Sequence, residues 1–399
     1  MKQLLFPHDQ QFWYETLRVF GHAAYGGADF GEVVATADRI VAGDYDSWHD
    51  AWLATAERLA SEAAKAHPVT ARELNLRAST YYRSAEFFLH GKPEDPRIAY
   101  AYERSVECFQ AALSENIVPV EIPYEGTVLH GYFYRAPGDG PKPLLVMHNG
   151  FDGAAEEMHF FGALGAERGY HVLTFDGPGQ PAAIHGSGLV FRPDWENVVG
   201  PVLDYAITRP EVDPARIALL GLSLGGALAP RAAAYEPRIA AVIAVDGVYD
   251  AATAVTSALP FSREELANRA NAATDPELDA IFAVARKQNP TIRWALDHGR
   301  YVMGASSDRA FVASYLDYHV RNGIAERITC PVLVCDAADD LFFSGDGKTK
   351  PEPQQLFDHL TGPKTMLRFT AEEGADAHCH VGAQRLATGR IYDWLDATL

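Results

Sequence analysis

The sequence predicts an α/β fold in which a mostly parallel sheet carries helices on both faces. Short apolar runs with the length of buried strands recur along the chain: Leu144–Met147, Val172–Phe175, Ile217–Leu220, Ala241–Val245, Val332–Val334 and Thr365–Phe369. The segments between most runs are long enough for crossover connections, which is the pattern of a doubly wound parallel sheet. The runs are apolar throughout rather than alternating, as expected of strands covered on both sides.

An antiparallel hairpin is expected to precede the parallel strands. Residues 118–122 alternate between apolar and polar side chains, and Glu125-Gly126 offers a turn. Residues 127–135 are then expected to return as the second strand of the hairpin.

Helical segments flank and interrupt this core. In the first third of the chain, apolar side chains recur at helical spacing, most clearly at Trp48, Trp52, Ala56 and Leu59. A later stretch is too long for a simple crossover, so we expect it to cap the sheet edge at which ligands bind in such folds. The predicted order is an N-terminal helical cap (1–117), the first part of the core (118–250), a helical cap insertion (251–328) and the second part of the core (329–399).

The charge balance excludes several classes of partner. The 399 residues include 34 Lys and Arg against 53 Asp and Glu, which gives a formal charge of −19. So acidic a surface repels nucleic-acid phosphates and anionic lipids, and we expect neither nucleic acid nor a membrane as a partner. No apolar run has the length of a signal peptide or a membrane span, and the four cysteines are scattered. We therefore expect a cytoplasmic protein with free thiols and a small-molecule substrate.

One motif carries the prediction of function. Gly221-Leu222-Ser223-Leu224-Gly225 directly follows the third apolar run and precedes an Ala-rich, helix-like segment. This strand–turn–helix context is typical of the nucleophile elbow of α/β-hydrolases. Side chains two residues either side of the serine would collide with the neighbouring strand and helix, which explains both glycines. We therefore predict that Ser223 is the nucleophile of a serine hydrolase.

A nucleophilic serine needs two partners. A histidine must take the hydroxyl proton, and a carboxylate must orient that histidine. In this fold the acid and then the histidine follow the serine along the chain. Asp340 lies where the acid is expected after the penultimate strand, with Asp339 and Asp336 as alternatives. After the last strand, His378 and His380 both qualify by position.

Two backbone amides must stabilise the negative charge that develops on the substrate oxygen. One is expected from Leu224, directly after the nucleophile, and the other from Phe151, in the loop after the first parallel strand. The run His378-Cys379-His380 also invites interpretation as a metal site. No second cluster with ligand spacing accompanies it, so no metal is expected.

Further motifs accompany the elbow at residues 43–48 (Gly-Asp-Tyr-Asp-Ser-Trp), 81–88, 175–180 (Phe-Asp-Gly-Pro-Gly-Gln), 209–214, 373–375 and 378–379. With them the chain resembles, over nearly its whole length, the α/β-hydrolases grouped with 2,6-dihydroxypseudooxynicotine hydrolase, the fungal polyketide-shortening pigment hydrolases and the fermentation-respiration switch esterase-like proteins. The resemblance implies the α/β-hydrolase fold with an N-terminal helical cap, no cofactor, and a homodimer. It also implies that His378, directly before the cysteine, is the catalytic histidine. One departure is Pro181, where relatives commonly have glycine, and we expect it to reshape that loop.

The sequence and the resemblance together predict hydrolysis of an acyl bond in a small aromatic or polyketide-like substrate. The bond is an ester or a carbon–carbon bond next to a ketone. Tyr82, Trp294 and Tyr301 of the predicted caps are candidates for substrate contact, although aromatic side chains more often pack in a core. The alternatives are a general carboxylesterase, a cyclase or lyase that uses the same triad, and a non-catalytic binding protein on a hydrolase scaffold.

Overall fold

The chain divides into two compact units. The computed structural model describes residues 2–256, 259–345 and 349–399; residue 1 of the predicted N-terminal cap, residues 257–258 of the predicted insertion and residues 346–348 of the second core segment lie outside the described residues. The smaller unit contains Met1–Glu115 and Asp279–Tyr301, and the larger contains Asn116–Leu278 and Val302–Leu399. Residues of the predicted insertion therefore belong partly to each unit.

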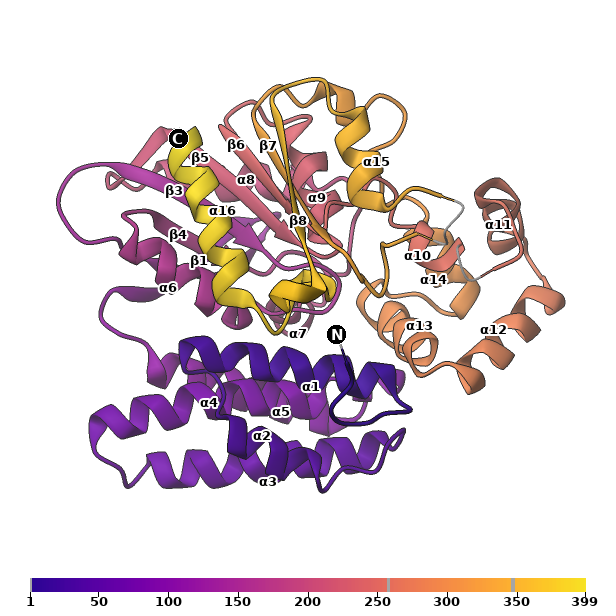
Figure 1. Ribbon diagram of the computed structural model, residues 1–399, viewed down its shortest axis with the longest axis horizontal. Coiled ribbons are helices and arrows are strands. Elements are labelled where there is room, and N and C mark those ends of the chain that lie inside the picture. The colour runs from indigo at the N-terminus through magenta and orange to yellow at the C-terminus, as the bar shows by residue number, and fades with distance from the viewer. Residues whose placement is uncertain (1, 257–258, 346–348) are drawn as a thin grey trace. The chain divides into compact units, whose positions relative to one another are not determined.

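A sheet forms the centre of the larger unit (Figure 1), with the strand order β1-β2-β4-β3-β5-β6-β7-β8. The strands are β1 Ile117–Tyr124, β2 Thr127–Tyr134, β3 Lys142–His148, β4 His171–Phe175, β5 Val212–Leu222, β6 Ala241–Val245, β7 Val332–Ala337 and β8 Lys364–Phe369. Strands β1 and β2 form an antiparallel hairpin, β2 pairs antiparallel with β4, and the remaining pairs are parallel. The predicted hairpin and the predicted mostly parallel sheet are confirmed.

Burial explains why the strands could be recognised. Every residue of β4, β6 and β7 is buried, so these strands need apolar side chains on both faces. Helices cover the sheet: α6 packs against α16, and α8 packs against α9, which also contacts β5 and β6. The helices of this unit are α6 His159–Glu167, α7 Pro181–Ser187, α8 Glu196–Ile207, α9 Gly225–Ala233, α10 Thr253–Thr256, α11 Arg263–Ala270, α14 Asp308–Tyr315, α15 Glu352–His359 and α16 Gln384–Thr398.

The smaller unit is helical, as predicted for the first third of the chain. Its helices are α1 Gln10–His22, α2 Phe30–Ala37, α3 Tyr45–Ala63, α4 Pro68–Glu86 and α5 Pro96–Ala112, joined by most of α12 (Pro276–Gln288) and α13 (Pro290–Val302). Asp44 caps α3 by accepting hydrogen bonds from the amides of Asp46 (3.0 Å) and Ser47 (3.2 Å). The predicted stripe on α3 is fully buried. Within the described residues, no helix has both the length and the apolar character needed to cross a bilayer.

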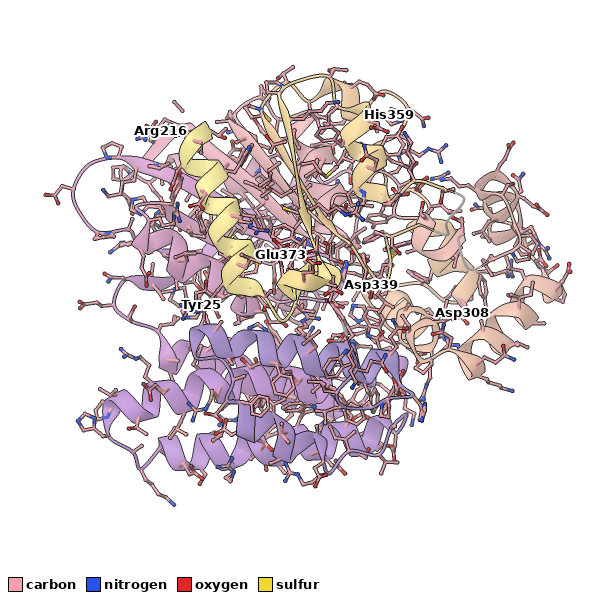
Figure 2. The ribbon with its side chains drawn as sticks, in the orientation of Figure 1. Tyr25, Arg216, Asp308, Asp339, His359 and Glu373 are labelled. Atoms are coloured by element: carbon pink, nitrogen blue, oxygen red, sulfur yellow. The ribbon has the colours of Figure 1, made fainter. Side chains whose placement is uncertain are left out.

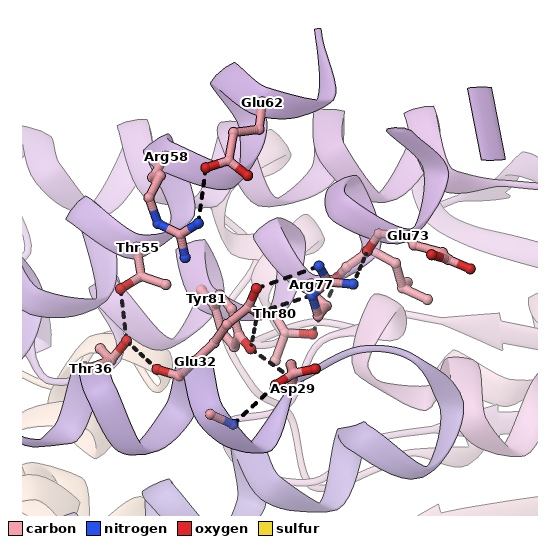
Figure 3. Close-up of polar contacts among 12 residues, drawn as sticks. Asp29, Glu32, Thr36, Thr55, Arg58, Glu62, Glu73, Arg77, Thr80 and Tyr81 are labelled. Atoms are coloured by element: carbon pink, nitrogen blue, oxygen red, sulfur yellow. Dashed lines mark hydrogen bonds and ion pairs between the residues drawn. The ribbon is translucent and has the colours of Figure 1, made fainter. Parts of the chain in front are cut away.

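Glu32 of α2 is neutralised by a basic neighbour, as Figure 3 shows. The guanidinium Nε of Arg77 lies 3.0 Å from Glu32 Oε2, and the Tyr81 hydroxyl donates to the same oxygen at 2.9 Å. Tyr81 in turn accepts a hydrogen bond from the amide of Asp29 at 3.0 Å. This partly buried network joins α2 to α4 and leaves no unbalanced charge on Glu32.

Candidate active site

Ser223 lies on a sharp turn between β5 and α9. Its φ is 59°, in the left-handed region that is unfavourable for a residue with a side chain. The turn is held by hydrogen bonds from Ser223 N to Val245 O (3.1 Å) and from Gly226 N to Ser223 O (2.7 Å). A Cβ atom at Gly221 would collide with the carbonyl of Gly225, so only glycine fits there. This is the strained strand–turn–helix arrangement that nucleophile elbows require.

His378 lies within hydrogen-bond distance of this serine. Its Nε2 is 2.8 Å from Ser223 Oγ. Its Nδ1 faces carboxylates and therefore holds a ring proton, so in the neutral imidazole Nε2 carries the lone pair and is positioned to accept the serine proton. His380, the other predicted candidate, donates from Nδ1 to Ala375 O (3.1 Å) and packs on the ring of Phe369 at a centroid distance of 4.0 Å. The structure brings His378, and not His380, to the serine.

Asp340 lies on the far side of His378 from the serine. Its Oδ2 accepts a hydrogen bond from His378 Nδ1 at 2.8 Å. Its Oδ1 accepts hydrogen bonds from the amides of Phe342 (2.7 Å) and Phe343 (2.9 Å). The turn after β7 therefore fixes one carboxylate oxygen and aims the other at the imidazole.

The two alternative aspartates lie elsewhere on the same segment. Asp339, labelled in Figure 2, is exposed on the loop, and its amide donates to Asp376 O at 2.9 Å. Asp336 at the end of β7 lies 3.2 Å from the guanidinium of Arg368. Of the three predicted candidates, Asp340 is the carboxylate that contacts His378.

Burial and charge together set the protonation of this pair. Burial lowers the pKa of His378, but the neighbouring Asp340, Cys379 and Asp246 outweigh burial and hold the pKa well above its usual range. Burial raises the pKa of Asp340, but contact with His378 and with backbone amides outweighs burial. The pKa of Asp340 is therefore below its ordinary value. Each shift favours the charged form, so the pair is arranged to carry a positive imidazole beside a negative carboxylate. A histidine that has taken a serine proton needs that arrangement.

The loop after β3 closely approaches the elbow. A Cβ atom on Gly150 would lie 2.6 Å from Leu224 N and 2.9 Å from Ser223 Cβ, so glycine is required for the approach. Phe151 follows directly, which brings its amide close to the nucleophile. In the part of the chain that the structure describes, Leu224 N donates to no protein acceptor, and Leu224 lies at the positive end of α9. Both predicted oxyanion donors therefore belong to backbone that borders Ser223.

Gln180 fixes the backbone of this loop, a role that the sequence did not reveal. Its buried side chain donates from Nε2 to Asn149 O (2.6 Å) and Gly150 O (3.2 Å) and accepts from Gly177 N (2.7 Å). These bonds hold the two carbonyls that precede the Phe151 amide. The neighbouring Pro181 is the first residue of α7, where proline is tolerated because first-turn amides have no helical partner.

The three side chains predicted to contact substrate lie in the smaller unit. Tyr82 is 1% exposed, and Trp294 is 4% exposed and stacks on Phe87 at a centroid distance of 5.5 Å. Tyr301 stacks on His90 at 4.6 Å. All three pack within that unit, and their contact with a substrate stays a prediction.

Other aromatic side chains pack against Phe151 and His378. The ring of Phe151 lies 6.0 Å from that of Phe311 and 5.7 Å from that of Tyr315, both on α14. Phe342 is partly exposed and packs edge-on against His378 at 4.9 Å. Tertiary contacts bring these segments together, and no local pattern marked them as neighbours of the nucleophile. Aromatic rings therefore pack both on the loop after β3 and on the histidine beside Ser223.

A second carboxylate at the histidine was also missed. Asp246, directly after β6, is 0% exposed, and its Oδ2 lies 3.0 Å from His378 Nδ1. The same oxygen accepts a hydrogen bond from the amide of Cys379. Burial raises the pKa of Asp246 to about 7. An acidic residue directly after an apolar strand is a signal in the sequence, but the usual order of the fold points to the segment after the penultimate strand for the acid.

These residues do not form a convincing metal centre. Ligand atoms of Asp246, His378 and Cys379 lie within 4.8 Å of one another. However, His378 Nδ1 is already hydrogen-bonded to Asp340, and burial raises the pKa of Cys379 to about 12. A metal requires the thiolate and a free imidazole nitrogen, so this donor set does not fit one.

Known proteins resemble this chain in sequence and in fold. A model described as the alpha/beta hydrolase family matches residues 144–386. Hydrolase LUC6 of a Fusarium species is 35% identical over 410 residues, which cover 97% of this chain and 96% of that protein. The 20-hydroxy-prefusarin hydrolase FUS2 of Gibberella moniliformis is 36% identical over 413 residues, with 97% and 96% covered. The crystal structure of 2,6-dihydroxy-pseudo-oxynicotine hydrolase superposes with a TM-score of 0.72 at 23% identity, over 95% of each chain.

Proposed function

Because the chain belongs to the alpha/beta hydrolase family, we propose that it is a serine hydrolase that cleaves an acyl bond through an acyl-enzyme on Ser223. One observation carries the proposal, namely the continuous hydrogen-bonded chain Ser223 Oγ, His378, Asp340, with both links at 2.8 Å. In this row of hydrogen bonds, Ser223 has a base to take its proton and a carboxylate to stabilise the resulting imidazolium.

The reaction begins with attack by Ser223 Oγ on the substrate carbonyl carbon, while His378 Nε2 takes the hydroxyl proton. The carbonyl oxygen becomes negative and is held by the amides of Leu224 and Phe151, each of which contributes about a hundredfold or more to the rate in comparable sites. His378 then gives its proton to the leaving group as the acyl–leaving-group bond breaks. Water repeats the two steps on the acyl-enzyme, and the carboxylic acid and free serine result.

The leaving group is either an alcohol or a carbanion. An ester releases an alkoxide that takes the proton from His378, and a carbon–carbon bond next to a ketone releases an enolate that is protonated at carbon. Both routes pass through the same oxyanion, so the triad serves either. We propose one of these two bonds as the target.

The proposed substrate is a small aromatic or polyketide-like carbonyl compound. The rings of Phe151, Phe311, Tyr315 and Phe342 near the nucleophile support an apolar, aromatic acyl group. By their names, FUS2 acts on 20-hydroxy-prefusarin and the solved relative acts on 2,6-dihydroxy-pseudo-oxynicotine. We propose a compound of comparable size for this chain.

Isotope incorporation tests the reaction class. The protein is incubated with a panel of aryl esters and aryl diketones in heavy-oxygen water, and the products are analysed by mass spectrometry. Hydrolysis predicts one heavy oxygen in the carboxylic product, with no product from Ser223→Ala. Turnover without incorporated oxygen would instead show a cyclase or lyase. Rapid turnover of nitrophenyl esters, with the diketones left intact, would favour a general carboxylesterase.

A further inference from the structure

We propose that Asp246 is a second orienting carboxylate for His378, which shares the Nδ1 proton with Asp340 and holds the imidazole when Asp340 is lost. The inference deepens the proposed function, since it assigns a positioning residue to the same triad. Its carboxylate contacts His378 Nδ1 and the amide of Cys379, so it acts through the histidine.

Two carboxylate oxygens lie close to His378 Nδ1, one in a hydrogen bond and one at ion-pair distance. Asp340 Oδ2 lies 2.8 Å and Asp246 Oδ2 lies 3.0 Å from the same nitrogen. Both distances are within the range of a charge-assisted bond, and the N–H can divide between two acceptors. The two carboxylates come from different strand ends, β7 for Asp340 and β6 for Asp246, so neither position depends on the other.

Asp246 is firmly held in this position. Its φ of 55° places it on a turn, and its Oδ2 accepts the amide of Cys379, the residue next to the histidine. The preceding residue, Val245, accepts a hydrogen bond from Ser223 N at 3.1 Å. The turn that carries Asp246 is therefore tied to the nucleophile on one side and to the histidine segment on the other.

The groups around Asp246 allow its carboxylate to be either protonated or charged. In the described structure, no arginine or lysine contacts it. The titratable groups that face it are Asp340, His378, Cys379, His380 and Cys335. His380 donates its Nδ1 proton to Ala375 O, so its Nε2 carries a lone pair, 3.9 Å from Asp246 Oδ1. A proton on Oδ1 would face that lone pair.

Asp246 presents two charge states to the histidine, depending on pH. Burial raises the pKa of Asp246 to about 7, so at lower pH the residue is a neutral acid and Asp340 alone faces the imidazole with a negative charge. Above this pH both carboxylates are charged. The imidazolium that forms when Ser223 gives up its proton is then stabilised by two charges instead of one. Reactivity of the serine therefore rises as Asp246 ionises.

Labelling by a small fluorophosphonate measures this reactivity without a natural substrate. Ser223 Oγ forms a bond to phosphorus, the phosphorus–fluorine bond breaks, fluoride leaves, and the serine proton passes to His378. We would compare labelling rates of wild type, Asp246→Asn, Asp340→Asn and the double variant between about pH 5 and about pH 9. Asp336→Asn is the matched control, because Asp336 pairs with Arg368 and not with the histidine.

The loss of labelling rate caused by Asp246→Asn is expected to depend on whether Asp340 is present. Asp340→Asn slows labelling about tenfold to a hundredfold, well short of the roughly ten-thousandfold loss expected when a histidine has no other orienting carboxylate. Asp246→Asn slows wild type only about threefold but slows the Asp340→Asn protein about a hundredfold. The wild-type profile also has an inflection near the pKa of Asp246 that Asp246→Asn lacks. Equal factors in both backgrounds, or unchanged profiles, would overturn the proposal.

A proton resonance separates this inference from the proposed function. The His378 Nδ1–H signal is expected at low field, and is assigned by its loss in His378→Asn. Asp246→Asn should shift it, whereas Asp336→Asn should not. If wild type takes no fluorophosphonate but the signal shifts, the hydrolase proposal fails and the shared bond stands. If wild type is labelled and the signal is unmoved, the hydrolase proposal stands and the second carboxylate is wrong.

Discussion

Each unit buries carboxylates, and one carboxylate from each unit shows two different ways of neutralising the charge. Glu86 of the smaller unit is 1% exposed, contacts the guanidinium of Arg83, and lies 2.6 Å from His90 Nε2. Asp246 of the larger unit is 0% exposed and, among the described residues, has no arginine or lysine partner. Its neighbours are the imidazole of His378 and a backbone amide. One acid is thus held by a permanent cation and the other by a group that gains and loses a proton.

This difference indicates where the chain has stability and where it has chemistry. An arginine stays charged at every accessible pH, so the Glu86 pair keeps its charge balance and supports the helices that carry it. An aspartate beside a histidine changes charge near neutral pH and is a poor structural contact for that reason. Departures from the rule that buried charges are permanently paired are expected at functional sites. Asp246 at the sheet edge is such a departure, and Glu86 of the helical unit is not.

The largest effect is expected at the histidine. His378→Asn should lower kcat/KM, or the rate of fluorophosphonate labelling, by about 10⁴-fold to 10⁶-fold, because the serine loses its base. His359→Asn is the control: that histidine lies on α15 (Figure 2), 2.7 Å from Glu326. A His378→Asn protein that keeps more than a few per cent of wild-type reactivity would show that another group takes the proton.

The arginine pair of the smaller unit should matter for stability instead. Arg83→Met leaves Glu86 buried without its guanidinium, and the free energy of unfolding should fall by about 3–5 kcal/mol in urea titration. The control is Arg58→Met, which removes the exposed ion pair with Glu62 (3.0 Å) shown in Figure 3 and should change stability by less than about 1 kcal/mol. Similar losses for both variants would contradict the contrast between buried and exposed pairs.

The loop that carries the Phe151 amide should be sensitive to its buried support. Gln180→Ala removes the donor to Asn149 O and Gly150 O, so kcat should fall about tenfold to a hundredfold as the oxyanion amide loses its alignment. Gln354→Ala is the control, since Gln354 bonds Asp358 on the surface of α15. A change confined to KM would mean that Gln180 shapes substrate binding rather than the oxyanion hole.

The smallest effect is expected in the pH dependence of stability at Asp246. Its folded pKa of about 7 is above the unfolded value, so its contribution to stability is complete below about pH 4 and is lost as the pH rises through 7. Asp246→Asn lacks that loss. Its Tm should match wild type near pH 4 and exceed it by a few degrees near pH 8. A Tm difference that is independent of pH would show that Asp246 does not hold a proton in the folded state.

The sequence predicted the sheet, and it predicted the sharp turn that carries Ser223, because both depend on local pattern. Each parallel strand is an apolar run, and the glycines around Ser223 are dictated by steric contacts within a few residues. The choice of Asp340 over Asp339 depended on which neighbour the turn after β7 buries, and no spacing rule fixes that. Asp246 and Gln180 act on residues far away in the sequence, so only the folded chain reveals them. The aromatic neighbours of the nucleophile were missed for the same reason.

The central claim is that Ser223 is an activated nucleophile, and intact-protein mass after incubation with a small fluorophosphonate tests it most directly. Wild type and Ser223→Ala would be treated side by side, with folding of the variant checked by circular dichroism. We predict a single phosphonyl adduct on wild type and none on Ser223→Ala. An unmodified wild type, or an equal adduct on the variant, would contradict the assignment of Ser223, His378 and Asp340 as a working triad.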